Sequence, residues 1–303
     1  MKKILFASTA LIFVAGAAAA DVVITGSASM GLKYDQTTKK TEVANDITFK
    51  MNGTATTDNG ISLGAIAELN DADEVHDTSV YMSTGGLKLT VGAVEEAADS
   101  GINDIGYDGI GVDDIVEKMR TNTKGVITNV KVGSGGVVEL VDPDAQDDQI
   151  ERKTEAATGW EDHNVNVAYT FGDFTASAST KSGTKNEYQI GLSGKVNGVS
   201  VGAGFGKTGT DDIMNLSVSY SMEGMSADVL YREVGTQKGY GLNVGYTTGD
   251  ITISAAYAKQ QNGEKKDAWG IGLAYDMGGA KLAAGFGEVD NQQKADLGIS
   301  FDF

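Results

Sequence analysis

The stretch WGIGLAYDMGG, residues 269–279, has the pattern of a β-strand that ends in a tight turn. Its large apolar side chains fall on one face of a two-residue period, and glycine, alanine and aspartate fall on the other. Three further stretches also place a tyrosine just before a turn: YTFGD (169–173), YSMEG (220–224) and YTTGD (246–250). A tyrosine at a constant height before each short turn is typical of the aromatic belt of a transmembrane β-barrel.

The same alternation continues through most of the chain. Ile47, Phe49 and Met51, for example, alternate with Thr48 and Lys50. The polar face of almost every run consists of Gly, Ser, Thr, Asn and charged residues, which line water rather than pack against a second sheet. We therefore predict an all-β fold, a transmembrane antiparallel β-barrel with a wet interior, that occupies residues 21–303 as a single domain.

Two strand counts are compatible with this pattern. Counting the alternating runs gives about 18 strands, of which the weakest cover residues 79–84, 126–133 and 137–141. The alternative is about 16 strands, and an even number is required if both termini lie at the short-turn end. Short turns alternate with longer polar segments, which we predict to be loops at 36–42, 71–78, 181–186, 207–212, 233–238, 260–267 and 289–293.

The first twenty residues have the features of a secretory signal peptide. Lys2 and Lys3 precede the apolar stretch 4–14, and alanines at 18–20 form a small-residue cleavage site. Beyond this segment no apolar run approaches the ~20 residues that a spanning helix needs. The mature chain is therefore expected to be exported and, if it enters a membrane, to do so as strands.

Composition limits the chemistry and the partners of the chain. It contains no cysteine, so disulfides and thiolate chemistry are not available. Its formal net charge is −18 at pH 7, which excludes nucleic acid as a partner and fits a cation-attracting pore. The same acidity also fits a solvated surface, so composition alone does not decide between the two.

One connection breaks the rhythm of hairpins, at about 94–123. It contains enough isoleucine and valine that we expect it to pack on something rather than stay fully solvated. In a wet barrel the available surface is the inner wall, so we predict a loop that folds inward and constricts the pore. The alternative is a solvent-exposed acidic loop. The acidic residues predicted to lie in the ion path are Glu95, Glu96, Asp99, Asp104, Asp108, Asp113, Asp114 and Glu117.

Two lysines are candidates for the opposite wall of this constriction. Lys33 and Lys50 fall on the inward face of the first two runs. Acids and bases across a constriction create a transverse field that orients dipolar solutes. The alternative is that each lysine is a charge near a rim.

The sequence contains neither a clear catalytic motif nor a clear metal-binding motif. The only histidines are His76 and His163, which are expected to be surface loop residues, and no Gly-x-Ser-x-Gly motif accompanies them. We therefore predict no enzymatic activity and no required cofactor. Ca²⁺ could bind the acidic stretch 103–114 through carboxylate and backbone oxygens, although its spacing does not match an EF-hand.

Several of these features together resemble the alphaproteobacterial, Rhodobacter-type general porins. They are the strand after the cleavage site, the insert after the fifth strand, the turn at 275–279 and the closing stretch ADLGISFDF at 295–303. The resemblance implies a homotrimer of 16-stranded barrels in the outer membrane, each narrowed by the loop after the fifth strand, that pass small hydrophilic solutes. Only three arginines are present (Arg120, Arg152 and Arg232), so the arginine-rich wall of such porins is missing and cations are favoured.

The end of the chain carries a second feature of that resemblance. Leu297, Ile299, Phe301 and Phe303 recur at two-residue steps and resemble the signal read by the barrel-assembly machinery. The same residues are also the lipid face of a last strand. A secreted acidic structural or adhesive β-protein is the alternative function, but it would need neither the terminal phenylalanine nor tyrosines at a constant height.

Overall fold

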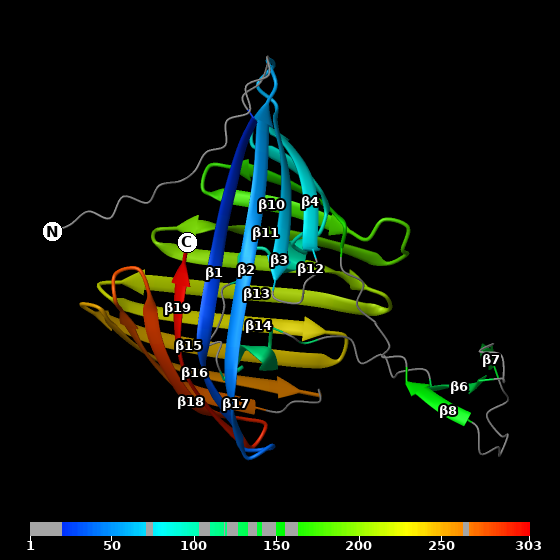
Figure 1. Cartoon of the computed structure of the whole chain (residues 1–303). Helices are drawn as coiled ribbons and strands as arrows, with labels where there is room; N and C mark the ends of the chain where they lie inside the picture. Colours follow the sequence, from blue (N-terminus) through cyan, green and yellow to red (C-terminus); the bar gives the residue numbers. More distant parts are fainter. Residues whose placement is uncertain are drawn as a thin grey trace.

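The structure, a computed structural model, describes residues 20–70, 75–102, 110–117, 119, 127–132, 138–140, 150–154, 163–262 and 267–303. In these residues sixteen strands form a closed antiparallel barrel (Figure 1). They are β1 (Ala20–Asp35), β2 (Lys40–Thr56), β3 (Ser62–Asn70), β4 (Val75–Thr84), β5 (Leu87–Gly92), β9 (Val165–Phe171), β10 (Phe174–Thr180), β11 (Glu187–Val196), β12 (Val199–Thr208), β13 (Asp211–Met222), β14 (Met225–Val234), β15 (Gln237–Thr248), β16 (Ile251–Gln261), β17 (Asp267–Asp276), β18 (Lys281–Val289) and β19 (Gln292–Asp302).

The two-residue period of the sequence becomes the two faces of the barrel wall. On β17, Trp269, Ile271 and Leu273 are exposed on the outside, whereas Gly270 and Gly272 are buried on the inside. Other strands of the described wall repeat this arrangement, with aliphatic and aromatic side chains outward. An exposed apolar band of this extent is stable only against lipid, so the wall has the surface of a membrane barrel.

The outer surface carries two aromatic belts, one more than the sequence predicted. The predicted tyrosines lie exposed beside the short turns, and a second set lies exposed near the other end of the strands. The first set is Tyr169, Tyr220, Tyr246 and Tyr275, and the second is Tyr188, Tyr240, Tyr257 and Trp269. On β17, Trp269 and Tyr275 are six residues apart, about 20 Å at ~3.3 Å per residue, which is close to the apolar height of such barrels.

The barrel has sixteen strands, and the count of 18 was wrong because one predicted hairpin lies outside the wall. The weak runs at 126–133 and 137–141 do form β6 (Ile127–Val132) and β7 (Val138–Leu140), but β6 pairs with β7 and with β8 (Ile150–Thr154) in a separate three-stranded sheet. The barrel closes without them, because β5 pairs directly with β9. The third weak run, at 79–84, belongs to the wall as part of β4.

The last strand closes the barrel against the first. The register places Ser27 of β1 opposite Asp302 of β19, so both ends of the barrel chain lie at the short-turn end. The Phe303 amide donates to the Gly26 carbonyl and the Gly26 amide donates to the Phe303 carbonyl, each at 2.8 Å. Leu297, Ile299, Phe301 and Phe303 form the outward face here, and the Phe303 ring stacks edge-on against Phe49.

The predicted difference between short turns and long loops holds only in part. The Asn197-Gly198 turn has positive φ at both residues, as a type I′ turn requires. However, the segments 207–212, 233–238 and 289–293 are mostly strand, joined by two-residue turns. Asp290 and Asn291 also have positive φ, so they form a tight turn where a loop was predicted. The polar residues at this end continue the strands instead of leaving them. Among the described residues, no helix is long and apolar enough to cross a membrane.

Candidate functional site: a loop against the inner wall

The connection after β5 enters the barrel and lies along its inner wall. Its first part contains the single 3-10 turn η1 (Ala97–Asp99). The Ala97 amide donates to Ser179 Oγ of β10 at 2.8 Å, and the Ala98 amide donates to Gln189 Oε1 of β11 at 2.9 Å. These bonds fix η1 to two neighbouring strands through its own backbone.

Further strands hold the same segment. Asn215 of β13 donates to the Ala98 carbonyl at 3.0 Å, and Ser217 Oγ donates to the Gly101 carbonyl at 2.8 Å. Upstream, Asn166 Nδ2 of β9 donates to the Glu95 carbonyl at 2.8 Å. Polar side chains of β9, β10, β11 and β13 therefore satisfy backbone groups of the loop that would otherwise be buried without partners.

An ion pair completes the attachment. Arg232 of β14 places Nη1 2.8 Å from Asp99 Oδ1, and its side chain is almost fully buried. Asn215 Nδ2 also donates to Asp99 Oδ1. The small number of arginines predicted weak attraction of anions by the pore. Arg232, however, holds the loop to the wall and does not line open water.

A buried polar cluster of His163, Ser179 and Glu187 contacts the same turn through Ser179. His163 Nδ1 lies 2.6 Å from Ser179 Oγ, and His163 Nε2 lies 3.9 Å from Glu187 Oε2. The histidine is 2 % exposed, so the prediction that it is a surface loop residue was wrong. The ring is buried because His163 lies just before β9 and contacts Ser179, the residue that binds the Ala97 amide of η1. The side chain of His76 lies outside the described part of the chain.

Glycines on the inner wall make room for the loop. A Cβ on Gly191 of β11 would overlap the Ala97 carbonyl oxygen, and a Cβ on Gly204 of β12 would overlap Ala98. A Cβ on Gly202 would lie 2.6 Å from the Gly101 carbonyl oxygen, closer than real Cβ atoms approach. The glycine-rich polar face, predicted to line water, therefore seats the loop along β11 and β12.

The later part of the loop packs by apolar contact. Ile110, Val112, Ile115, Val116 and Met119 are all buried, and residues Asp113–Ile115 form the 3-10 turn η2. They pack with a patch of inward-facing apolar residues on strands β13 to β18: Ile213, Leu230, Val234, Ala258, Ala268 and Val289. Glycines again form the floor, since a Cβ on Gly287 would lie 2.7 Å from the Ile110 side chain. This contact accounts for the apolar content of the insert.

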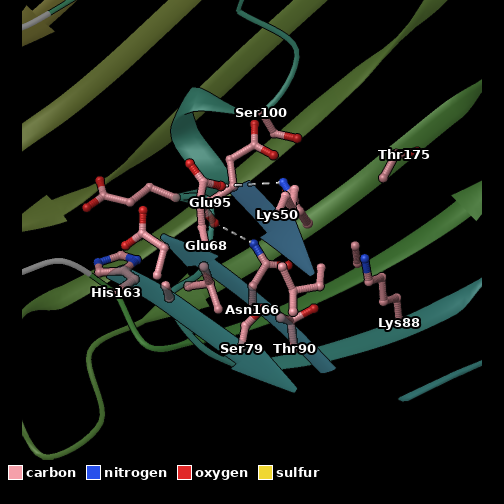
Figure 2. A pocket seen from close by; sticks show the side chains of 17 residues that line it. Lys50, Glu68, Ser79, Lys88, Thr90, Glu95, Ser100, His163, Asn166 and Thr175 are labelled. Carbon is pink, nitrogen blue, oxygen red and sulfur yellow. Dashed lines mark hydrogen bonds and ion pairs between the residues drawn. The ribbon is translucent and has the colours of Figure 1, made fainter. Parts of the chain in front are cut away.

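A cavity of about 740 Å³ remains on the other side of the loop. It is lined by loop residues on both sides of η1, by residues of β2 to β5, and by β9 and β10 (Figure 2). Its charged lining residues are Lys50, Glu68, Asp77, Lys88, Glu95 and Glu96. A second cavity of about 500 Å³ shares Lys50 and Glu68 with it and extends to Phe303 at the short-turn end.

The eight acidic residues predicted in the loop take different positions. Glu95 and Glu96 line the 740 Å³ cavity, whereas Asp99 faces the wall and Asp113 is buried at 9 % exposure. Glu117 is half-buried. Asp114 lies in η2, and Asp104 and Asp108 lie outside the described residues.

The two predicted lysines lie at different heights of the wall. Lys50 lines the cavity and its Nζ lies 3.8 Å from Glu68 Oε2 on the neighbouring strand. Lys33 is paired in register with Glu42 and Asp296 instead. It lies roughly 26 Å further along the strand than Thr25, the register partner of Lys50, at ~3.3 Å per residue. The structure therefore brings Lys50, but not Lys33, to the loop.

Glu95 has an altered titration. Burial and the nearby Asp99 carboxylate raise the pKa of Glu95 above its ordinary value. Glu96 accepts a hydrogen bond from Gln189 Nε2, which holds it in place. Among the residues that the structure describes, no group of three or more metal-ligating side chains is present. The predicted Ca²⁺ stretch lies largely outside those residues.

A closed barrel with a lipid-facing exterior, a polar interior and a loop fixed inside it defines a class of channel-forming membrane proteins. Comparison with known proteins gives the family. The sequence pattern of the Gram-negative porin family matches residues 7–295. The chain therefore belongs to the Gram-negative porins, and its sixteen-stranded barrel is an outer-membrane porin channel.

Solved structures share this fold at low identity. A triple mutant of the Rhodopseudomonas blastica porin is 18% identical with a TM-score of 0.67, and the match covers 93% of this chain and 100% of that chain. A loop L8 deletion mutant of OmpT, an outer membrane protein of Vibrio cholerae, is 14% identical with a TM-score of 0.62, over 94% and 99% of the two chains. No match was found among curated proteins.

Proposed function

We propose that this porin passes small hydrophilic solutes and ions by passive diffusion and prefers cations. One observation supports this most directly. The open cavity beside η1 is lined by four carboxylates (Glu68, Asp77, Glu95 and Glu96) and two lysines (Lys50 and Lys88). Excess negative charge in a narrow aqueous passage raises the local concentration of cations and lowers that of anions.

The geometry of the loop explains why these residues would form the constriction. Its polar part is fixed to strands β9 to β14, and its apolar part packs on strands β13 to β18. Among the described residues, open space lies between the loop segment around η1 and strands β2 to β5, and it continues toward the short-turn end past Lys50 and Glu68. Solutes would therefore pass along the β2 to β5 wall.

Planar-bilayer recording tests the cation preference. We expect stepwise ohmic channels whose reversal potential in a KCl gradient favours K⁺ over Cl⁻. Replacing Glu95 and Glu96 together by Gln should lower the K⁺/Cl⁻ permeability ratio about twofold or more, whereas Glu42→Gln, outside the cavity, should change it little. An anion preference in the native channel would contradict the proposal.

A homotrimer is also proposed, and the shape of the wall supports it. Strands β5, β9 and β10 have 6, 7 and 7 residues, fewer than the ~9–11 that a strand needs to cross a bilayer. Neighbouring subunits would cover this low part of the wall and shield its strand ends from lipid. The chain has no native cysteine, which makes single-cysteine cross-linking direct.

The cross-linking experiment compares two outward positions. Val167 of β9 and Ile271 of β17 are both exposed on the outer face. Val167→Cys should give covalent dimers and trimers with a short bifunctional maleimide in membranes, and Ile271→Cys should stay monomeric. Cross-linking at β17 without cross-linking at β9 would place the interface elsewhere, and absence of cross-linking at β9 and β17 alike would contradict the proposed trimer.

Export and assembly remain part of the proposal. Residues 1–20 would act as the signal peptide, and Leu297, Ile299, Phe301 and Phe303 would be read by the barrel-assembly machinery. The closer relation to alphaproteobacterial general porins is supported by the closing stretch and the turn at 275–279. Ca²⁺ binding at the acidic part of the loop is proposed only for the stretch around 103–114.

A further inference from the structure

Two opposite charges in the cavity have no partner ion. Lys88 of β5 and Glu95 of the loop both line it, and neither takes part in an ion pair among the residues that the structure describes. Lys50 and Glu68, by contrast, form an ion pair with Nζ and Oε2 3.8 Å apart. The cavity therefore presents the Lys88 ammonium and the Glu95 carboxylate to a solute, and Asp77 is a further carboxylate in its lining.

Both groups are held by neighbouring residues. The Lys88 Nζ lies 4.5 Å from the centre of the Tyr81 ring, which attracts a cation through its π face. Tyr81 lies directly over Gly64, because a Cβ on that glycine would overlap the ring. On the other side, the backbone of Glu95 is fixed by the hydrogen bond from Asn166.

The space between these charges is polar. Figure 2 shows Glu95 and Lys88 apart in the cavity lining, and Lys50, Asn166 and Thr90 lie between them in this view. Hydroxyl and amide groups here can donate and accept hydrogen bonds to a solute without adding charge. The volume, about 740 Å³, is within the range of small-molecule sites.

We propose that this cavity is a weak binding site for small zwitterions that carry one ammonium and one carboxylate, such as amino acids and short peptides. The solute ammonium would lie at Glu95 and its carboxylate at Lys88. A simple cation would gain the Glu95 contact but meet repulsion from Lys88, and a simple anion would meet the reverse. This binding site presupposes the proposed diffusion function, and zwitterions are the class of solute that the channel would favour.

Weak binding is consistent with transport. Both charges are accessible to water, so each contact contributes little, and a solute that binds can leave again. The length of the solute should matter, because only one separation of its two charges can satisfy both Lys88 and Glu95. This dependence on length distinguishes a two-point site from general attraction by an acidic pore.

Titration of single-channel KCl current at pH 7 tests the site. The probes are glycine, 4-aminobutanoate and 6-aminohexanoate, with butylamine, butanoate and butanamide as the matched compounds that lack one or both charges. We expect one zwitterion of the series to reduce the current saturably and at lower concentration than any matched compound. Lys88→Gln and Glu95→Gln should each raise its half-blocking concentration about two- to fivefold.

Two control variants remove a charge elsewhere. Lys195→Gln and Glu42→Gln lie outside the cavity lining and should leave the half-blocking concentration within error. The charge-exchanged double variant, Lys88→Glu with Glu95→Lys, should recover block by the same zwitterion. Heat-dependent electrophoretic mobility checks that each variant forms a folded barrel.

The outcomes separate this inference from the proposed function. Channels that conduct KCl but show no difference between zwitterions and their singly charged analogues would overturn the site. The same holds if Lys88→Gln and Glu95→Gln behave like their controls. Absence of any channel activity from the native folded protein would instead contradict the diffusion function itself.

Discussion

Replacing Gly191 by alanine should displace the loop without altering the barrel. The Cβ of alanine would occupy the position of the Ala97 carbonyl oxygen, which belongs to the backbone of η1 and cannot rotate away. Gly53 of β2 provides a matched control, because the nearest atom to a Cβ there is 4.0 Å away. Both glycines lie in strands, so the two substitutions change local strand propensity in the same direction.

The cost to the loop follows from the bonds that this shift breaks. The Ala97 and Ala98 amides donate to Ser179 and Gln189 at 2.8 and 2.9 Å. Each such bond contributes about 0.5–1.5 kcal/mol, so docking should weaken by about 2 kcal/mol, a factor of roughly 30 in the docked-to-undocked ratio. The Arg232–Asp99 pair and the apolar contacts remain, so the loop stays inside the barrel but moves away from β11.

Single-channel recording measures the result. Among the described residues, the cavity is open space into which η1 can move away from β11, so Gly191→Ala should lower the mean conductance and increase the open-channel noise. Gly53→Ala should match the native channel in both. If Gly191→Ala and Gly53→Ala give the same conductance and noise, the loop does not rest on Gly191 and the geometry of the constriction is wrong.

Other predictions test the remaining contacts. On acidification, cation preference should begin to decline at a higher pH than an ordinary glutamate would give, because the raised pKa of Glu95 makes this carboxylate lose its charge earlier. Reversal potentials recorded at a series of pH values check this. The early decline should be absent in Glu95→Gln. Arg232→Met should leave the partly buried Asp99 without its cation and weaken loop docking by about 1–3 kcal/mol, measured as faster proteolysis within the loop of an otherwise folded barrel. Ile110→Asp should place a charge in the apolar contact with β17 and β18 and raise current noise, whereas the outward Ile271→Asp should impair membrane insertion instead. With Trp160 replaced by Phe, Trp269 should fluoresce at a wavelength typical of a membrane interface and be quenched most by lipids brominated near the headgroup.

The barrel could be predicted from sequence because its period is local. In each strand, alternate residues are apolar and polar, so the sequence of β17 alone indicates a membrane strand. The strand count could not be settled locally, since the hairpin at β6 and β7 has the same kind of pattern as a wall strand. Only the pairing of β5 with β9 excludes it from the barrel.

The second aromatic belt was visible in the sequence but was missed. Tyr240 and Tyr246, like Trp269 and Tyr275, are separated by six residues on one strand, and each pair marks both edges of the apolar band. The polar stretches outside this band were predicted to be loops. They are strand, because a barrel strand can extend past the apolar layer with polar side chains on both faces.

The anchors of the loop could not be predicted in the same way. Ser179, Gln189 and Asn215 have the same composition and spacing as residues that face water, so nothing local distinguishes them. Their role depends on which segment lies opposite, and that is a property of the closed barrel. Arg232 is the exception that composition could have indicated, because a lone arginine on an inward face requires a partner if it is buried.

The loop divides the inner wall into two surfaces with different consequences for function. Where β11 to β18 contact the loop, substitutions act on the pore only by moving the loop, as Gly191→Ala should. On β2 to β5 the wall remains open, and a charge such as Lys88 meets the solute directly. Variants of the first kind should change conductance and noise together, and variants of the second kind should change selectivity at nearly constant noise. Recording both quantities for each variant therefore shows which surface a residue belongs to.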